Sequence, residues 1–394
     1  MTTVPFDIAA EATARNQSLL DLRRDFHQHP ELSWQETRTA GIIAERLQAA
    51  GLEVQHGICG TGVVGVLRGD LPGRTIAWRA DIDALPIQEK VDLPFASVNE
   101  GVMHACGHDG HTAIGITVAE TLAARRKHMA GTAVFIFQPA EETLDGAKPM
   151  IAAGVLENPH VEAVLGLHLT ARDPMGQVLI QPGPTFASAD FFDIEVKGEG
   201  GHGAFPHLSV DPITVAAHIL IGLQDLVAKE IPAHDAAVLT IGQVQAGTKH
   251  NIIPADAVLR GSLRTYRQNV RDQVVERMGA FASRIAQAYR AEANLRLVGE
   301  YCPPVESDEN IADKVRRSAL AVVAAENVAE GQPMMGSDDM SLFLKERPGC
   351  YFRVGCGIPG QEITHHHPEF QIDERSLDIA LRVALQAMHD ALQP

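Results

Sequence analysis

The segment Met103–His111 concentrates metal-ligating side chains, because it reads Met-His-Ala-Cys-Gly-His-Asp-Gly-His. Neutral imidazole and thiolate are donors that divalent transition metals prefer. An extended backbone would point Cys106 and His108 to the same side, and a helix beginning here would place His108 and His111 on one face. The alternative is an ordinary helix N-terminus with Asp109 as its cap. The density of donors favours a metal site, with a binuclear centre as the working hypothesis and its other ligands elsewhere in the chain.

The acidic pair Glu141–Glu142 follows an apolar run at 132–137 that is typical of a fully buried strand. Pro139 ends that strand, so both carboxylates are free to converge in a loop. Two neighbouring carboxylates can divide the work of a hydrolytic site, because one can ligate a metal while the other moves protons. The alternative, a solvated turn, is disfavoured by the buried strand that leads into the pair.

Two more strand patterns end in polar side chains. The run at 75–80 leads directly into Asp81 and Asp83, and the run at 163–167 leads into His168. Residues just beyond the carboxyl ends of buried strands lie where open α/β sheets place their sites. For each segment alone, a strand-ending turn is an equally good interpretation. Taken with the preceding pair, His168 becomes a candidate ligand.

The remaining patterns predict the elements that must position these side chains. Apolar periodicity predicts helices at 8–28, 35–50, 108–125, 308–325 and 376–391, and strands at 62–68, 75–80, 132–137, 163–167 and 350–355. Gln181–Pro184 and Cys302–Pro304 are rigid joints, natural limits for an inserted domain. Between the joints the pattern predicts strand 191–196, helix 211–228, strands 237–245 and 256–264, and helix 270–290, a small open sheet with helices on one face.

Bulk properties restrict the class of protein. A chain of 394 residues with 45% hydrophobic and 21% charged residues indicates a globular protein of two domains. The net charge of −17 argues against nucleic acid as a partner, which needs a basic face. No apolar run approaches the ~20 residues that cross a bilayer, so no membrane partner is expected. Five cysteines without framework spacing, and a start at Met1–Ala14 without a signal-peptide pattern, favour reduced thiols in the cytoplasm.

Several motifs, taken together, resemble the M20 metallopeptidase family. They are Arg79–Pro86, Met103–His111, Phe137–Glu142 and Gly166–His168, in the expected order, and the resemblance covers essentially the whole chain. The most similar subfamily is that of the N-acyl-amino-acid amidohydrolases, which includes hippurate hydrolases and auxin-conjugate hydrolases. The resemblance implies an α/β fold in which a mixed-sheet catalytic domain, with helices on both faces, spans 1–182 and 304–394. A smaller α+β lid and dimerisation domain at 183–303 interrupts it.

The resemblance also implies a set of metal ligands. The family pattern of a His, one variable residue and then Pro selects His366 from the run His365–His367. The implied cofactors are two divalent metal ions, and mixed N, O and S donors suit manganese, zinc, cobalt or nickel. The expected ligands of the two ions are Cys106, His108, Glu142, His168 and His366.

Other roles are implied by the same motifs. Glu141 is the expected general base, and His202 is the residue that reaches the substrate carbonyl. Asp83 is expected to orient either a ligand or the metal-bound water. Asn251 is expected to contact substrate. Arg264 is expected either to hold a substrate carboxylate bidentately or to form a salt bridge on the strand surface.

Two acidic positions depart from the family pattern. Asp81 stands where related subfamilies carry a ligand histidine, so a weak or water-mediated metal contact is expected there. Asp338 stands where the family usually has Glu in a Glu-Asp-aromatic sequence, and its role is left open. Ser337 is expected to cap the helix that follows.

The expected activity is that of a metal-dependent amidohydrolase. It would cleave the amide bond of N-acyl-L-amino acids, with an acetyl, benzoyl or similar acyl group, by a metal-activated water and a glutamate general base. The alternatives are an M20-type dipeptidase or exopeptidase, and a non-catalytic metal-stabilised dimer. The expected partners are the small-molecule substrate and a second copy of the chain, bound through the lid domain.

Overall fold

The computed structural model describes residues 6–394, which form two compact units. Unit 1 runs to Thr185 and resumes at Val305–Gln332 and Asp338–Pro394. Unit 2 comprises Phe186–Pro304 and Pro333–Ser337, and is therefore inserted into the chain of unit 1. Residues 1–5, the start of the predicted segment 1–182, lie outside the described residues.

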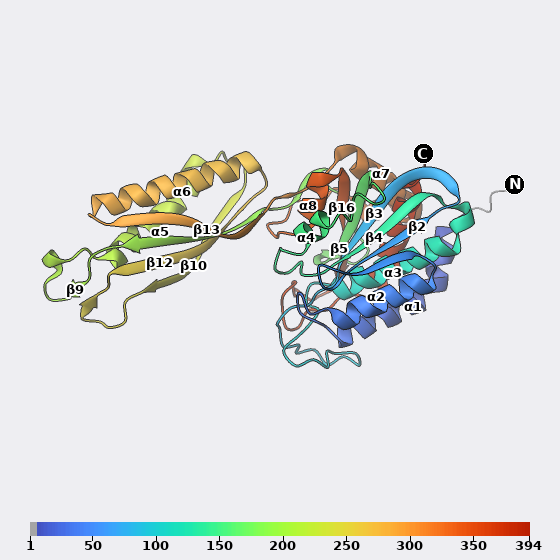
Figure 1. Ribbon diagram of the computed structural model, residues 1–394, viewed down its shortest axis with the longest axis horizontal. Coiled ribbons are helices and arrows are strands. Elements are labelled where there is room, and N and C mark those ends of the chain that lie inside the picture. The colour runs from blue at the N-terminus through green and yellow to red at the C-terminus, as the bar shows by residue number, and fades with distance from the viewer. Residues whose placement is uncertain (1–5) are drawn as a thin grey trace. The chain divides into compact units, whose positions relative to one another are not determined.

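Unit 1 is built on an eight-stranded sheet of order β1-β2-β4-β3-β5-β16-β6-β15 (Figure 1). The strands pair in parallel from β4 through β3 and β5 to β16, while β1, β2 and the β16–β6 pair are antiparallel. The mixed sheet predicted from the sequence is thus confirmed. Its strands are β1 (Glu53–Ile58), β2 (Gly62–Arg68), β3 (Leu71–Asp81), β4 (Ala130–Gln138), β5 (Ala163–Pro174), β6 (Val178–Leu179), β15 (Val328–Ala329) and β16 (Gly349–Gly357).

Helices cover both faces of this sheet, as predicted. In β4, Phe135 and Phe137 belong to one core with the helices α1, α3 and α9, whereas Val134 and Ile136 point to the other face and are also buried. That alternation explains the unbroken apolar run of the strand, since both of its faces are covered. The helices of unit 1 are α1 (Ile8–Gln28), α2 (Thr37–Ala49), α3 (His108–Ala124), α4 (Ala147–Ala152), α7 (Glu309–Val322), α8 (Met340–Glu346) and α9 (Arg375–Ala391).

Unit 2 is a four-stranded antiparallel sheet of order β10-β12-β8-β13 with two helices packed on it. The strands are β8 (Ala189–Lys197), β10 (Ala237–Ala246), β12 (Asp256–Thr265) and β13 (Glu292–Cys302), and the helices are α5 (Pro212–Glu230) and α6 (Gln268–Ala288). A two-stranded ladder joins β9 (Gly201–His202) to β11 (Ile252–Ile253). A second ladder joins β7 (Gly183–Phe186) to β14 (Val305–Ser307), where the chain leaves and re-enters unit 1. The predicted α+β class is confirmed, although the edge strand β13 was not predicted.

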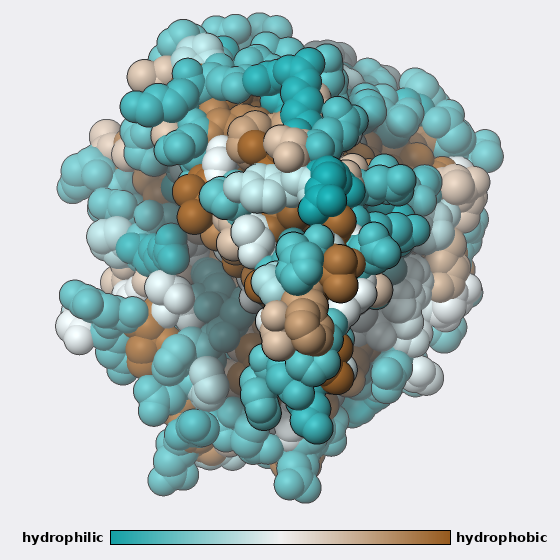
Figure 2. All heavy atoms as spheres, turned by 90° about the vertical axis from the view of Figure 1, so that its left-hand side faces the viewer, coloured by the Kyte–Doolittle hydropathy of each residue, from teal (hydrophilic) through white to brown (hydrophobic). Residues whose placement is uncertain are grey.

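Helix α5 is long and apolar enough to cross a membrane by length and composition. Its side chains Val215, Ile219 and Leu223 are, however, fully buried in the core of unit 2. The molecular face in Figure 2 is mostly hydrophilic, with hydrophobic residues in small groups between polar ones. We therefore interpret α5 as a core helix.

Candidate active site

The predicted metal ligands of unit 1 lie together at one place. The donor atoms of Cys106, His108 and His168 lie within 4.8 Å of one another, and so do those of Cys106, Glu142 and His366. These side chains come from the start of α3, from β5, and from the loops after β4 and β16. The arrangement is two adjacent three-donor groups that share one thiol, which is the geometry expected for a pair of cations.

Backbone carbonyls fix the orientation of two of the imidazoles. The Nδ1 of His108 lies 2.9 Å from the carbonyl oxygen of Asp83, and that of His168 lies 2.6 Å from the carbonyl oxygen of Leu169. A carbonyl only accepts, so each Nδ1 carries a proton and each Nε2 is the nitrogen left to bind a metal. The Nε2 of His168 faces the Sγ of Cys106 at 3.6 Å.

Buried polar atoms in the site lack partners of their own. Among the residues that the structure describes, the Nε2 of His108 and the Oε1 of Glu142 are buried without a hydrogen-bond partner, and they lie 3.9 Å apart. An unpaired buried polar atom is costly, and a cation between such atoms removes that cost. The donor set therefore fits a transition-metal centre.

The electrostatics of the site favour positive charge. Burial lowers the pKa of His108, but Asp81, the hydrogen bond to Asp83 and the charge of Glu142 outweigh burial and raise this pKa to about 10. Burial and the charges of the acidic pair raise the pKa of the Cys106 thiol well above its usual value. Without a cation the thiol stays protonated, whereas a bound divalent metal reverses this balance and gives a thiolate.

The start of α3 differs from the capping arrangement considered above. Gly107 is the N-cap, with φ of 91°, a left-handed conformation that glycine adopts without strain. Asp109 lies within the first turn and accepts the N–H of the adjacent Gly110 at 2.9 Å, but it is not the N-cap, so that alternative is wrong. Its buried carboxylate instead accepts from the Nδ1 of His27 at 2.8 Å and pairs with the Nε of Arg23 at 2.9 Å. This network anchors the helix that carries His108.

His111 belongs to neither of the two donor groups that contain Cys106, but it holds neighbouring segments of the site in place. Its Nδ1 lies 2.6 Å from an oxygen of Asp81, and its Nε2 accepts the backbone N–H of Leu169 at 2.9 Å. Both ring nitrogens are therefore engaged, and the ring connects the end of β3 to the strand that carries His168. The Asp81 carboxylate, in turn, pairs with Arg79 at 2.6 Å.

The loop after β4 presents the acidic pair. The Glu142 N–H donates to the Oδ2 of Asp83 at 3.0 Å, and the Ser33 hydroxyl donates to the same oxygen at 2.7 Å. An oxygen of Glu141 lies 3.8 Å from the Nε2 of His108. Burial, followed by the charges of Asp338 and Glu142, raises the pKa of Glu141 well above its usual range. A carboxylate in such a place is a strong acceptor for a proton.

A buried cation, Arg79, lies among the carboxylates next to Glu141 and was not predicted from the sequence. Arg79 is fully buried and lies 2.6 Å from Asp81, 2.9 Å from Asp339 and 3.2 Å from Asp338. One guanidinium thus pairs with three buried carboxylates. A signal for it was present, because a charged residue inside the apolar strand 75–80 needs buried partners.

The predicted site residues of unit 2 fall into two places. His202 lies in β9 and Asn251 directly precedes β11, so the two belong to one ladder, in which the Gly203 N–H donates to the Asn251 carbonyl at 3.0 Å. Arg264 lies near the last residue of β12. The first residue of that strand, Asp256, pairs with Lys197 at the end of β8. Asp256 and Arg264 are eight positions apart along the strand, which is roughly 26 Å. Unit 2 therefore does not bring His202 and Arg264 together.

The local contacts of these residues define their available atoms. The Nδ1 of His202 accepts the Ala204 N–H at 3.0 Å, so its proton is on Nε2, and the side chain is exposed. Arg264 donates to the Ser337 hydroxyl at 2.6 Å and to the Met335 carbonyl at 3.1 Å. Ser337 is thus not the cap of α8, whose N-cap is Asp339.

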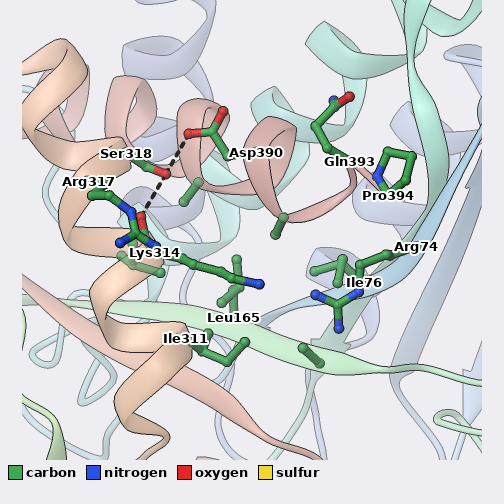
Figure 3. A pocket seen from close by; sticks show the side chains of 14 residues that line it. Arg74, Ile76, Leu165, Ile311, Lys314, Arg317, Ser318, Asp390, Gln393 and Pro394 are labelled. Atoms are coloured by element: carbon green, nitrogen blue, oxygen red, sulfur yellow. Dashed lines mark hydrogen bonds between the residues drawn. The ribbon is translucent and has the colours of Figure 1, made fainter.

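A cavity of about 560 Å³ lies elsewhere in unit 1 (Figure 3). Its floor includes Ile76 of β3 and Ala163 of β5, and its walls come from α7 and α9. The candidate ligands lie within β5, at the start of α3 and in the loops after β4 and β16, whereas this cavity lies near the amino-terminal parts of β3 and β5. It is therefore distinct from the candidate active site.

Comparison with known proteins agrees with this geometry. Residues 77–390 match the family described as peptidase family M20/M25/M40. The chain is 42% identical to the N-acetylcysteine deacetylase of Bacillus subtilis over 363 residues, covering 92% of this chain and 93% of that protein. It is 38% identical to thermostable carboxypeptidase 1 of Saccharolobus solfataricus, covering 94% of each.

A solved structure extends the comparison to three dimensions. The Bacillus subtilis YXEP protein, described as a dinuclear metal-binding peptidase of the M20 family, superposes with a TM-score of 0.85. It is 37% identical, and the match covers 96% of this chain and 99% of that one. The family resemblance read from the sequence is therefore confirmed. The chain belongs to peptidase family M20/M25/M40 and is a metal-dependent hydrolase that acts on amides.

Proposed function

We propose that this protein hydrolyses the amide bond of N-acyl-L-amino acids, with an acetyl, benzoyl or similar acyl group. The observation that carries the proposal is the pair of three-donor groups sharing Cys106, with Glu141 beside them. The similarity to an N-acetylcysteine deacetylase supports the substrate class. The similarity to a carboxypeptidase supports the second candidate, an exopeptidase that uses the same site.

We assign one cation to Cys106, His108 and His168, and the other to Cys106, Glu142 and His366. Manganese, zinc, cobalt and nickel all suit this mixture of donors. When bound, the two ions supply Lewis-acid polarisation and lower the pKa of a coordinated water. Asp83 holds His108 through its carbonyl and the Glu142 N–H through its carboxylate, so it orients two of the ligands.

The proton transfers then fall to Glu141. Its buried carboxylate takes the proton of the attacking water and hands it to the departing amine. The Nε2–H of His202 donates to the carbonyl oxygen as negative charge develops, a contribution typically worth about 3 kcal/mol of barrier. Asn251 contacts the substrate from the same ladder. Arg264 has no acidic partner among residues 6–394, so its charge is available to a substrate carboxylate.

We propose that the active protein is a homodimer, formed through the lid domain 183–303, in which one subunit's His202 serves the other's site. The separation of His202 from Arg264 supports this, because a single unit 2 cannot offer both to one small substrate. The cysteines are all free, which suits a cytoplasmic location.

A mixing experiment tests the shared site. His202→Ala and Glu141→Gln proteins should each be nearly inactive, yet subunit exchange between them should restore activity, since half of the dimers then contain one intact site. With random exchange the mixture should approach about a quarter of wild-type turnover. A mixture that stays inactive after exchange, verified by tagged-subunit pull-down, would show that His202 does not act across subunits.

Cys106→Ala should lower the metal content, because both donor groups lose their shared ligand. Elemental analysis of the purified variant after dialysis should find clearly fewer than two metal ions per chain. Cys356→Ala is the matched control, since Cys356 is equally buried in β16 and belongs to neither group. Unchanged stoichiometry in Cys106→Ala would make Cys106 a packing residue.

The substrate proposal is tested with matched pairs of compounds. N-acetyl, N-benzoyl and indole-acetyl amino acids are assayed beside dipeptides with a free amine, with added Mn²⁺ or Zn²⁺ and after chelation. Turnover of the acylated compounds that disappears with chelator and returns with metal is expected. Preference for the dipeptides would favour the exopeptidase, and metal binding without any turnover would favour the non-catalytic dimer.

A further inference from the structure

The residue before the acidic pair has an unusual backbone. Ala140 has φ of 54°, in the left-handed region that residues with a Cβ rarely adopt. Its side chain is fully buried, so no solvent compensates for the strain at this position. A buried N–H must also find an acceptor within the protein. The turn that leads into Glu141 therefore depends on surrounding contacts that hold it.

Glu36 supplies that contact. Its Oε1 accepts the Ala140 N–H at 2.9 Å, and its Oε2 accepts the Thr61 hydroxyl at 2.6 Å. Glu36 is 0% exposed, an unusual place for a carboxylate. Each of its two oxygens therefore has one defined partner, and one of these is the strained backbone next to the proposed general base.

Helix capping does not account for this side chain. Glu36 is the N-cap of α2, but its carboxylate makes no hydrogen bond to that helix. A second carboxylate holds the other side of the turn, because Asp83 accepts the Glu142 N–H at 3.0 Å. Two buried carboxylates thus bind the N–H groups on either side of Glu141, and they come from different elements.

We propose that Glu36 is a positioning residue for proton transfer. By accepting the Ala140 N–H it fixes the left-handed turn, and that turn directs the Glu141 carboxylate towards the metal ligands. Glu36 itself touches neither substrate nor metal. The inference rests on the proposed function of Glu141, and it adds a residue from the start of α2 to the machinery of the same site.

The first test separates kcat from KM. Glu36→Ala leaves the Ala140 N–H without its acceptor, so kcat should fall about 10- to 100-fold, while KM changes less than about threefold and metal content is retained. Glu36→Gln should recover most of kcat, because its carbonyl oxygen can accept from Ala140 while its NH₂ group donates to Thr61. If Glu36→Ala does not fold, Glu36→Met fills the same space without an acceptor.

Two control variants distinguish positioning from general stability. Thr61→Val removes the other hydrogen bond of Glu36, and Leu47→Ala removes a buried side chain of α2 away from the turn. Both should lower the melting temperature yet keep kcat within about twofold. A loss of kcat in the controls as large as in Glu36→Ala, or no recovery in Glu36→Gln, overturns the proposal.

Hydrogen exchange of the peptide that contains Ala140 gives a readout independent of activity. The Ala140 amide should be protected in the wild type and in Glu36→Gln, and should exchange faster in Glu36→Ala. If the wild type does not cleave N-acyl amino acids, the proposed function is wrong. Hydrogen exchange of the Ala140 amide still decides, independently of that result, whether Glu36 holds the turn. Equal protection in Glu36→Ala and wild type would reject the role of Glu36 alone.

Discussion

Glu141→Gln is expected to lower kcat by about 1,000-fold while both metal ions stay bound. The amide keeps the shape of the carboxylate but cannot accept the proton of the attacking water. Glu141 belongs to neither of the two donor groups that contain Cys106, so both of these groups remain complete in the variant. Initial rates on an N-acetyl amino acid, together with elemental analysis of the same preparation, measure both quantities.

Glu142→Gln is the matched control, because it makes the same change at the adjacent position. Glu142 shares a donor group with Cys106 and His366, so this variant should lose metal together with activity. Turnover near the wild-type rate in Glu141→Gln would remove the general-base assignment. Loss of metal in that variant would instead make Glu141 a ligand.

The main elements of the fold could be predicted because their hydrophobic patterns are strong. The run 132–137 is apolar throughout, and the structure shows why, since both faces of β4 are covered. The edge strands β1 and β13 carry no such signal. Every residue of β1 is exposed or only partly buried, and β13 buries only Ala293 and Cys302, so neither pattern departs clearly from that of a loop.

The candidate site could be predicted only in part, and the missing part is long-range. Glu142 was found because it follows the end of the buried strand β4, a local signal, and His168 because it comes after an apolar run at 163–167. The predicted end of that strand was wrong, because β5 continues to Pro174 and His168 lies within it. The partners of Arg79 were not found, because Asp339 lies 260 residues away and no spacing rule connects them. The alternative of Asp109 as a cap fails for a related reason: Asp109 looks like a cap in sequence, but its tertiary partners Arg23 and His27 determine its role.

Arg79 deserves a direct test of stability, because several buried carboxylates depend on its charge. Its guanidinium pairs with Asp81, Asp338 and Asp339, and all four side chains are essentially inaccessible to solvent. Even with Arg79 present, the pKa of Asp339 is raised to about 7. Burial is the largest cause, the charge of Arg79 partly opposes it, and the charge of Asp338 raises the pKa further. Removal of the cation would leave buried charges without compensation.

Arg79→Met is therefore expected to lower the free energy of unfolding by about 3–5 kcal/mol at pH 8. The deficit should shrink as the pH falls towards 5.5, because a carboxyl group whose folded-state pKa is raised takes up a proton and becomes neutral. Both tryptophans, Trp34 and Trp78, lie in unit 1, so urea unfolding followed by their fluorescence reports on this unit.

Arg74→Met on the same strand is the control: its ion pair with Glu162 is largely exposed, so it should cost less than about 1 kcal/mol at either pH. Equal effects of the two substitutions, or a deficit in Arg79→Met that does not change with pH, would mean that the carboxylate cluster does not depend on Arg79.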